Sequence, residues 1–350
     1  MKALVFYEFK DGAVEIREVP VPEIGPDDVL LRVKAAAVCG SDIERIHCHN
    51  KNAKTPVIIG HEFCGVVEKV GGNVVAWKPG DRAVSENTGH VCGHCHACSV
   101  GKFLYCNERT LMGGKMDGGF AEFVRIPGEV LKVYPKTLRR LPDNLSFEEG
   151  AVLEPSVNAY YAVVQEGGLQ VGQNVVIFGP GPIGLFGVAW AKMGGAAQIV
   201  LIGGSEDRLE FGRSLGADHI VNYRKTPDVV GEVEKRLGKN EADAIVDFAG
   251  GKNVLTDSIA LARPYAARIV LVGWAGEQTV DLGPGMRKGV EIIGHLGYDS
   301  VSWDRVLRMA SQGAVDYKRF VSGVFPLDQW REAFAGMEER RYIKSVFNSF

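Results

Sequence analysis

The chain has 350 residues, of which 46% are hydrophobic and 24% are charged, and its formal net charge is −3. This length allows two domains, and the lack of a basic surplus excludes a typical nucleic-acid binder. No stretch approaches the roughly 20 apolar residues that cross a bilayer, and the first residues, MKALVFYEFKDG, lack the apolar core of a signal peptide. We therefore expect a cytoplasmic protein with no membrane partner.

The first 150 residues are predicted to be rich in β-strands, because short apolar runs there are separated by Gly, Pro and Asp. The clearest runs are 29–38, 56–71 and 81–85. From about residue 170 the pattern changes, and strands that are apolar on both faces alternate with helical segments. Those strands are 175–179, 198–204, 219–223, 242–251 and 267–274. This alternation predicts an α/β fold with a parallel, doubly wound sheet.

After about residue 290, the segments 304–313 and 327–341 are predicted to be helices capped by Asp. We therefore expect a β-rich domain over 1–152 and a sheet domain over 153–292. Residues 293–350 are too few for a domain of their own and are expected to pack back onto the first one.

Four of the seven cysteines have the spacing C-x2-C-x2-C-x7-C, at Cys92, Cys95, Cys98 and Cys106. Two-residue gaps let thiolates turn toward one ion, and four thiolates close a tetrahedral zinc site that has only a structural role. Bacterial iron–sulfur runs have a last gap of three residues followed by Pro, which differs from this pattern. His94 and His96 are alternative ligands that four cysteines make unnecessary, and an odd cysteine count argues against a disulfide framework.

A second set of zinc-ligating residue types stands at the ends of apolar runs, at Cys39, His61, Glu62 and Glu154. Each alone has an ordinary structural explanation, such as a buried thiol or a carboxylate at a helix start. Together, a thiolate, an imidazole and carboxylates suit an open zinc site that keeps a position for substrate. Such a zinc ion acts as a Lewis acid on a hydroxyl.

A glycine loop follows the run 175–179 and opens a predicted helix. Gly179, Gly181 and Gly184 give the spacing G-x-G-x-x-G. The first glycine permits the turn, the second the approach of a pyrophosphate, and the third close helix packing. The loop, which also contains Pro180, Pro182 and Ile183, is therefore predicted to bind a dinucleotide at the helix N-terminus.

The choice between NAD and NADP depends on the end of the next strand. NAD sites place Asp or Glu there to hold the ribose, but this chain has Gly203. The missing carboxylate favours NADP, with Ser205 and Arg208 as candidate partners of the 2′-phosphate. Alternatively, Glu206 or Asp207 serves NAD from one turn later.

These motifs, in this order, resemble those of the zinc-dependent medium-chain dehydrogenases, the family of alcohol, sorbitol and threonine dehydrogenases. The resemblance covers nearly the whole chain and also includes CGSD, GHEFCGVV, DGGFAEFV and LEP, at 39–42, 60–67, 117–124 and 153–155. It implies a GroES-like catalytic domain with a zinc lobe over 1–152 and a Rossmann domain over 153–292. It also implies that 293–350 return to the catalytic domain and that the active site lies in the cleft.

The resemblance also implies roles at the active site. Cys39 and His61 would ligate catalytic zinc, and Glu62 would be a direct or alternating ligand. Glu154 would ligate the zinc or hydrogen-bond its water, and Ser41 would relay the proton of the substrate hydroxyl.

Two positions depart from the family pattern. Glu44 stands where a relay histidine is often found, with His47 and His49 as nearby alternatives. Gly297 stands where enzymes of the sorbitol type carry an Arg, which argues against sorbitol as the substrate. The neighbouring Tyr298 and Asp299 are candidate substrate contacts.

The sequence thus predicts an oxidoreductase that transfers hydride between a secondary alcohol and NAD(P), with two zinc ions per subunit. The expected alcohol is a polyol, sugar acid, sugar phosphate or cyclitol. The resemblance also implies a homodimer or homotetramer, paired through 267–274 and the segment that follows. The alternatives are a zinc-free reductase on the same scaffold and a non-catalytic NADPH-binding redox sensor.

Overall fold

The computed structural model describes residues 1–49, 54–239, 241–274 and 276–350. The chain forms two compact units, the first made of Met1–Glu154 with Asp299–Phe350 and the second of Pro155–Tyr298. The first change from one unit to the other thus comes two residues after the expected boundary at 152. The second change comes six residues after the expected boundary at 292. Within the described residues, no helix has both the length and the apolar character needed to span a bilayer.

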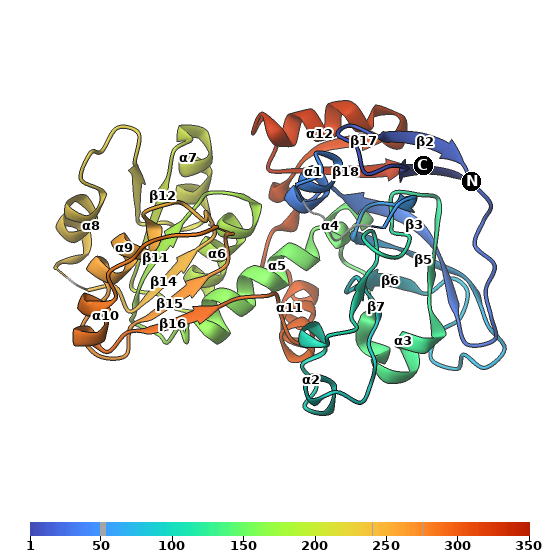
Figure 1. Cartoon of the computed structure of the whole chain (residues 1–350), viewed down its shortest axis with the longest axis horizontal. Helices are drawn as coiled ribbons and strands as arrows, with labels where there is room; N and C mark the ends of the chain where they lie inside the picture. Colours follow the sequence, from blue (N-terminus) through green and yellow to red (C-terminus); the bar gives the residue numbers. More distant parts are fainter. Residues whose placement is uncertain (50–53, 240, 275) are drawn as a thin grey trace. The chain divides into compact units, whose positions relative to one another are not determined.

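The first unit is built on a seven-stranded sheet with the order β10-β6-β5-β3-β18-β17, in which β9 also pairs with β3. Figure 1 labels five of its strands, β3, β5, β6, β17 and β18. These strands are β3 Val29–Ala37, β5 Glu62–Val70, β6 Arg82–Ser85, β9 Phe123–Ile126, β10 Leu138–Arg140, β17 Val321–Pro326 and β18 Lys344–Ser349. Two smaller sheets consist of β1 Lys2–Phe6, β2 Val14–Glu18 and β4 Val57–Ile58, and of β7 Thr88–His90 and β8 Thr110–Leu111. Residues 321–326 and 344–349 thereby complete a sheet that begins in the N-terminal half.

Short helices connect these strands, and the core between sheet and helices is apolar. The helices are α1 Gly40–Ile46, α2 His96–Ser99, α3 Gly128–Val133, α4 Phe147–Ala151, α11 Ser300–Ser311 and α12 Trp330–Glu338, with α5 Leu153–Tyr160 leading into the second unit. Phe63, Phe120, Phe334 and Phe347 are buried in one apolar cluster. The four phenylalanines thus join residues from both ends of the chain.

The second unit has six parallel strands in the order β13-β12-β11-β14-β15-β16. They are β11 Asn174–Phe178, β12 Gln198–Gly203, β13 His219–Asn222, β14 Ala244–Asp247, β15 Arg268–Leu271 and β16 Glu291–Gly294. The intervening helices include α6 Pro182–Met193, α7 Glu206–Leu215, α8 Val229–Leu237, α9 Val254–Leu261 and α10 Gly283–Lys288. The order reverses at β11, and a sheet of this kind binds ligands at the carboxyl ends of the strands on either side of that reversal. The predicted doubly wound sheet is therefore confirmed.

One helix begins earlier than the sequence pattern suggested. The expected Asp-capped helix at 304–313 begins at Ser300, and its N-cap is Asp299, whose carboxylate accepts the backbone N–H of Ser302 at 2.8 Å. Asp304 lies inside the helix, where it pairs with Arg139. Both residues are short acids before an apolar periodic segment, so the pattern alone did not distinguish them.

The tight pairing of β3 with β5 leads to a test of packing at Gly65. A Cβ at Gly65 would lie 2.0 Å from the carbonyl oxygen of Arg32, whereas a Cβ at Gly72 would meet nothing within 4 Å. We expect Gly65→Ala to lower the free energy of unfolding by about 1–3 kcal/mol, because the strands must separate locally. Gly72→Ala is the matched control and is expected to change it by about 0.5 kcal/mol or less. Denaturant titration of both variants measures this, and equal losses would contradict the analysis.

Candidate active site

The pairing of β3 with β5 places Cys39, His61 and Glu62 together. Ala37 at the end of β3 lies opposite Glu62 at the start of β5. Cys39 follows two residues after Ala37 as the N-cap of α1, and His61 directly precedes Glu62. The thiol of Cys39, one ring nitrogen of His61 and a carboxylate oxygen of Glu62 all lie within 4.8 Å of one another. This donor set of one soft and two harder ligands suits zinc.

Asp42 fixes two of these ligands from the first turn of α1. Its fully buried carboxylate accepts the backbone N–H of Cys39 at 3.1 Å and lies 3.3 Å from Nδ1 of His61 and 3.5 Å from Arg45. Burial lowers the pKa of His61, but the charge of Asp42 and the Cys39 thiol outweigh it and raise that pKa. Because Nδ1 is engaged by Asp42, Nε2 is the ring nitrogen left to bind a metal.

Lys344, at the start of β18, pairs with Glu62. Both side chains are almost fully buried, and the ammonium also donates to the carbonyl oxygen of Val38 at 2.8 Å. Burial lowers the pKa of Lys344, but Glu62, Cys39 and Glu154 together raise it above its ordinary value. Lys344 is therefore a buried cation that pairs with the Glu62 carboxylate.

Glu154 lies in the same electrostatic environment but is not one of the three ligand groups that meet. Its Oε1 accepts a hydrogen bond of 3.1 Å from Nδ2 of Asn87. Oδ1 of Asn87 in turn accepts a bond of 2.9 Å from Arg109. The sequence pattern named Glu154 but neither of these two partners.

The residues predicted to move a proton have different surroundings. Ser41 is half-buried in the first turn of α1, and Glu44 is exposed on the same helix. His47 lies 2.7 Å from Asp11 and 2.6 Å from Glu338, one carboxylate at each ring nitrogen. Hydrogen bonds to Asp11 and then to Glu338 raise the pKa of His47 above its ordinary value. His47 thereby bridges two carboxylates that lie on different segments of the first unit.

The four-cysteine lobe has the geometry of a closed tetrahedral site. The Sγ atoms of Cys92, Cys95, Cys98 and Cys106 all lie within 4.8 Å of one another. Cys92 lies 4.0 Å from Cys98 and 3.6 Å from Cys106. Zn–S bonds of about 2.3 Å in a tetrahedron place sulfurs about 3.8 Å apart. The four thiols therefore fit a single zinc ion.

The glycine loop between β11 and α6 has a distinct steric reason at each glycine. Gly179 has a φ of +97°, and a Cβ at Gly184 would lie 2.0 Å from the carbonyl oxygen of Gly179. A Cβ at Gly181, the N-cap of α6, would meet nothing within 4 Å. The first glycine serves the turn and the third serves packing, while the second leaves open space at a helix N-terminus where phosphate binds.

The end of β12 lacks room for a carboxylate. A Cβ at Gly203 would lie 2.4 Å from Cγ of Pro180, so the proline ring takes the space of a side chain. Ser205 is half-buried at the start of α7, whereas Arg208 is buried in that helix. Glu206, the alternative ribose ligand, accepts bonds from Asn222 and Lys225 at 2.7 and 2.8 Å.

Tyr223 and Arg224, the two residues that follow β13, lie next to the end of β12. A Cβ at Gly204 would lie 2.5 Å from Oη of Tyr223 and 3.0 Å from Nε of Arg224, so both side chains lie against that glycine. Tyr223 also lines a cavity of about 550 Å³ together with Phe178, the last residue of β11, and Ile202, the last but one of β12. The cavity therefore lies where a sheet of this type binds nucleotides.

The two predicted substrate contacts have structural partners. Tyr298 is 5% exposed, and Asp299 caps α11, where its carboxylate accepts both the N–H and the hydroxyl of Ser302 at 2.8 Å. Lys102 lies 3.5 Å from the other oxygen of Asp299. A substrate role for Asp299 would have to compete with these bonds.

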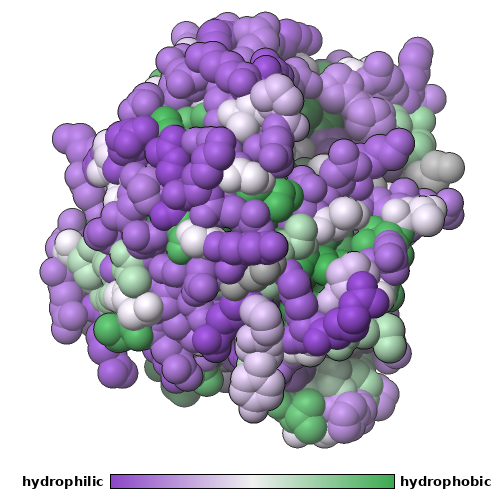
Figure 2. Space-filling model, turned by 90° about the vertical axis from the view of Figure 1, so that its left-hand side faces the viewer, coloured by the Kyte–Doolittle hydropathy of each residue, from purple (hydrophilic) through white to green (hydrophobic). Residues whose placement is uncertain are grey.

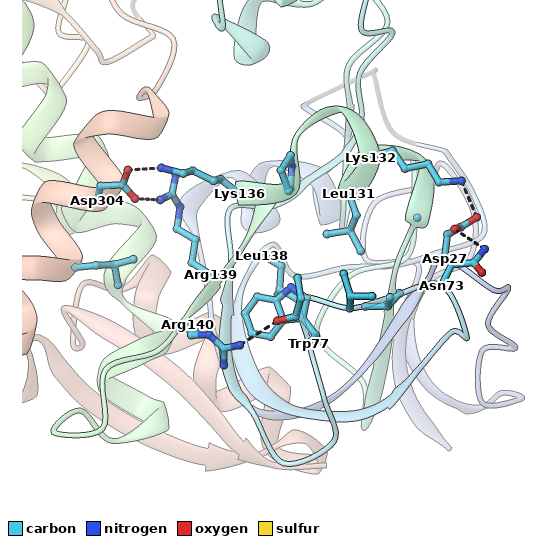
Figure 3. A pocket seen from close by; sticks show the side chains of 16 residues that line it. Asp27, Asn73, Trp77, Leu131, Lys132, Lys136, Leu138, Arg139, Arg140 and Asp304 are labelled. Carbon is cyan, nitrogen blue, oxygen red and sulfur yellow. Dashed lines mark hydrogen bonds and ion pairs between the residues drawn. The ribbon is translucent and has the colours of Figure 1, made fainter.

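A cavity of about 550 Å³ in the first unit is lined by none of the predicted site residues. Figure 3 shows Trp77 and Leu131 facing it, with the Lys132–Asp27 pair at one side and the Arg139–Asp304 pair at the other. The charged groups around this cavity are paired with one another. Its size does not make it the candidate site.

Four residues of the site were missed by sequence reasoning. Lys344 begins the mixed polar and apolar segment 344–349, and Arg224 lies in the NYRK segment after the run 219–223, so the sequence showed neither residue's partner. Asp42 was part of the CGSD motif without an assigned role. Asn87 had no local signal, because its partners are 67 and 22 residues away.

Comparison with known proteins finds relatives over nearly the whole chain. Residues 25–136 match the alcohol dehydrogenase GroES-like domain, and residues 182–312 match the zinc-binding dehydrogenase domain. The chain is 37% identical to an uncharacterised zinc-type alcohol dehydrogenase-like protein of Escherichia coli K12, over 99% of this chain and 98% of the relative. It is 33% identical to D-arabitol-phosphate dehydrogenase of Enterococcus avium, over 95% and 93%.

Two solved structures have the same fold with different cofactors. An alcohol dehydrogenase of Escherichia coli CFT073 with NADH has a TM-score of 0.89 at 28% identity, covering 99% of both chains. A zinc-binding dehydrogenase of Sinorhizobium meliloti with NADP has a TM-score of 0.89 at 27% identity, covering 99% of this chain and 98% of the other. With both domains matched and a relative 37% identical over its full length, this chain belongs to the zinc-dependent medium-chain dehydrogenase family.

Proposed function

We propose that this protein oxidises secondary alcohols of the polyol or phosphorylated polyol type with NADP, or reduces the matching ketones. The observation that carries the proposal is the meeting of Cys39, His61 and Glu62 within 4.8 Å at the end of the β3–β5 pair. An open set of three protein ligands leaves a position for a substrate oxygen. The likeness to dehydrogenases of alcohols and of a polyol phosphate supports the reaction class.

The chain's own residues divide the chemistry among them. Cys39 and His61 would hold catalytic zinc, with Glu62 or Glu154 as a further ligand, and the ion would supply Lewis acidity to an alcohol hydroxyl. Ser41, half-buried beside Cys39, accepts the hydroxyl proton and passes it on. Asp42 keeps His61 in the orientation that a metal needs, and Lys344 holds the Glu62 carboxylate in place through a buried ion pair.

Glu44 is our candidate for the position of the family's relay histidine. It is exposed, so it exchanges protons with solvent directly. His49 is exposed as well, whereas His47 is held by two carboxylates. The proton would therefore leave through Ser41 and reach solvent at Glu44.

NADP is the proposed cofactor because the corner beside Gly203 excludes a ribose-binding carboxylate and offers a cation. Pro180 fills the space that an aspartate would need, and Glu206 is engaged by Lys225 and Asn222. Tyr223 and Arg224 lie against Gly204, where an arginine stabilises a 2′-phosphate through charge-assisted hydrogen bonds. Arg224 replaces the buried Arg208 as our main candidate, and Ser205 remains beside it.

The proposed assembly is a homodimer or homotetramer that extends the sheet of the second unit. β16, which follows the expected segment 267–274, is an edge strand of that sheet. Apolar side chains interrupt the hydrophilic surface in several places (Figure 2). In this unit, the exposed large apolar residues include Trp274, Leu282, Met286, Ile292 and Leu296. Exposed strand edges with apolar neighbours favour pairing with another chain.

Cys39→Ser tests the catalytic metal site. We expect alcohol-dependent formation of reduced cofactor to fall about a thousandfold, because several kcal/mol of charge stabilisation are lost. The zinc content should fall from two ions per subunit to one. Cys48→Ser, at a half-buried cysteine outside both ligand groups, is the control and should behave as the wild type. Full turnover by the Cys39 variant without the second zinc would refute the mechanism.

Cys106→Ser tests the structural site. The apparent binding free energy of a closed zinc site is on the order of 10 kcal/mol, so losing one of its thiolates should release the ion and unfold the lobe. We expect one zinc fewer per subunit and rapid proteolysis between residues 92 and 106. Ser99→Ala, on the helix of the same lobe, should leave both unchanged. Iron rather than zinc in the purified wild type would contradict the assignment.

Fluorescence titration with NADPH and NADH tests the cofactor. We expect NADPH to bind about ten to a hundred times more tightly, as a charge-assisted hydrogen bond of about 1.5–3 kcal/mol implies. Arg224→Gln should remove most of that preference, while Arg236→Gln, on the exposed face of α8, should keep it. Tighter binding of NADH by the wild type would mean that Glu206 or Asp207 holds the ribose after all.

A further inference from the structure

All four polar groups of Asn87 are engaged, although it lies in a turn between β6 and β7. Its N–H donates to Oγ of Ser85 at 3.0 Å, and its C=O accepts the N–H of Met112 at 2.9 Å. Its side-chain Oδ1 accepts from Arg109 at 2.9 Å, and its Nδ2 donates to Oε1 of Glu154 at 3.1 Å. Asn87 is only 3% exposed, so each bond is made away from bulk water. A buried amide with no spare group has one orientation.

The backbone at Asn87 restricts which residues fit there. Its φ is +60°, a left-handed conformation that Asn, Asp and Gly adopt far more readily than other residues. Gly would lack the donor to Glu154, and Asp would place a second negative charge against that carboxylate. Asn alone combines the backbone conformation with a neutral donor.

Arg109 decides which end of the amide faces Glu154. The guanidinium donates only, so Oδ1 of Asn87 must turn toward it and Nδ2 must turn away, toward Glu154. Arg109 also donates to Oγ1 of Thr88 at 3.2 Å, which fixes its own direction. It lies three residues after Cys106, so it is attached to the four-cysteine lobe.

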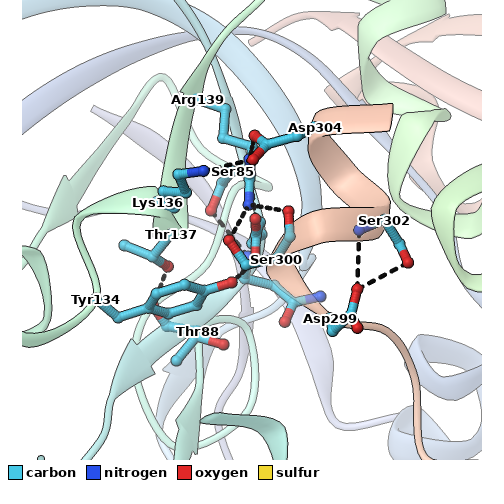
Figure 4. Close-up of polar contacts among 12 residues, drawn as sticks. Ser85, Thr88, Tyr134, Lys136, Thr137, Arg139, Asp299, Ser300, Ser302 and Asp304 are labelled. Carbon is cyan, nitrogen blue, oxygen red and sulfur yellow. Dashed lines mark hydrogen bonds and ion pairs between the residues drawn. The ribbon is translucent and has the colours of Figure 1, made fainter. Parts of the chain in front are cut away.

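The residues on either side of Asn87 are fixed by a second set of bonds. Glu86, fully buried, accepts bonds from Tyr134 and Arg139. Figure 4 shows Thr137 reaching the backbone carbonyl of Thr88, a bond of 2.6 Å, and Arg139 reaching Ser300. These bonds hold the turn on both sides of Asn87 and so keep its amide beside Glu154.

We propose that Asn87, oriented by Arg109, is a positioning residue that sets the plane of the Glu154 carboxylate toward the catalytic metal. The inference rests on the proposed function, in which Glu154 ligates zinc or binds its water. Groups that orient a ligand in this way are worth about ten- to a hundredfold in metal affinity or activity. Arg109 also makes the four-cysteine lobe a determinant of the catalytic site.

Two substitutions at Asn87 separate positioning from folding. Asn87→Gly keeps the left-handed backbone and removes the amide, and Asn87→Asp keeps the shape but turns a donor into an anion. We expect both to retain the wild-type thermal unfolding temperature within a few degrees. The catalytic metal should bind about ten to a hundred times more weakly, measured by competition with a chelator. Asn73→Gly, at an exposed amide bonded to Asp27, is the matched control and should retain wild-type affinity.

A cobalt-substituted enzyme gives a readout that a purely structural role would not change. Visible absorption of Co²⁺ bound by Cys39 reports the ligand geometry, so the Asn87 variants should shift this band while the control does not. In the same variants kcat should fall while the KM for the cofactor stays constant. Arg109→Met should shift the band in the same direction by a smaller amount, and Arg109→Lys, which still donates, should restore part of it.

The outcomes distinguish this inference from the proposed function. A wild type that oxidises alcohols with two zinc ions, together with Asn87 variants of unchanged metal affinity, spectrum and kcat, overturns the positioning role alone. A wild type without catalytic metal or turnover overturns both. Unfolding of Asn87→Gly with normal folding of Asn87→Asp and an unshifted cobalt band would assign Asn87 to stability only.

Discussion

The ladder between β3 and β5 is the constraint on which the candidate site depends. Ala37 opposite Glu62 brings the end of one strand beside the start of the other, and the candidate ligands Cys39 and His61 lie just beyond that pair. On the other side of β3, the pairing of Ala37 with Val346 in β18 brings Lys344 to the same place. A slip of one residue in either register would turn the side chains to the opposite face and separate the ligands. The register is therefore as important to the chemistry as the ligands themselves.

Around the ligands lies a layer of buried polar groups whose partners hold them in single orientations. Asp42 contacts Cys39 and His61, Lys344 pairs with Glu62, and Asn87 donates a hydrogen bond to Glu154. Such groups are costly to bury, and their desolvation is offset only when each finds its partner. The benefit is orientation, because a side chain that is already held in its binding orientation loses little conformational freedom when a metal binds. Such partners contribute more to a fixed arrangement of the side chains than to the free energy of unfolding.

The glycine loop of the second unit is the proposed site for the phosphates of the cofactor. Each of the three glycines in the loop meets a different steric requirement. One allows the turn, one leaves open space, and one allows close packing. The ring of Pro180 then takes the space at Gly203 where a ribose-binding carboxylate would stand. One residue of the loop thus bears on both the phosphate approach and the choice of cofactor. The proposed preference for NADP rests on this exclusion together with the cation at Arg224.

The sequence by itself determined the features that are local or periodic. The cysteine spacing predicted the lobe, the glycine spacing predicted the loop, and the apolar runs predicted the doubly wound sheet, because ligand gaps, tight turns and strand periods are set within a few residues. The start of α11 was misplaced, since two acids of similar capping power lie five residues apart. Only the tertiary structure decided the partners that come from distant segments. The sequence did not predict three of these contacts, those of Lys344 with Glu62, Arg224 with Gly204 and Asn87 with Glu154. Their contacts depend on strand register and on turns that bring together residues far apart in the chain, and a single sequence carries no local signal for such pairs.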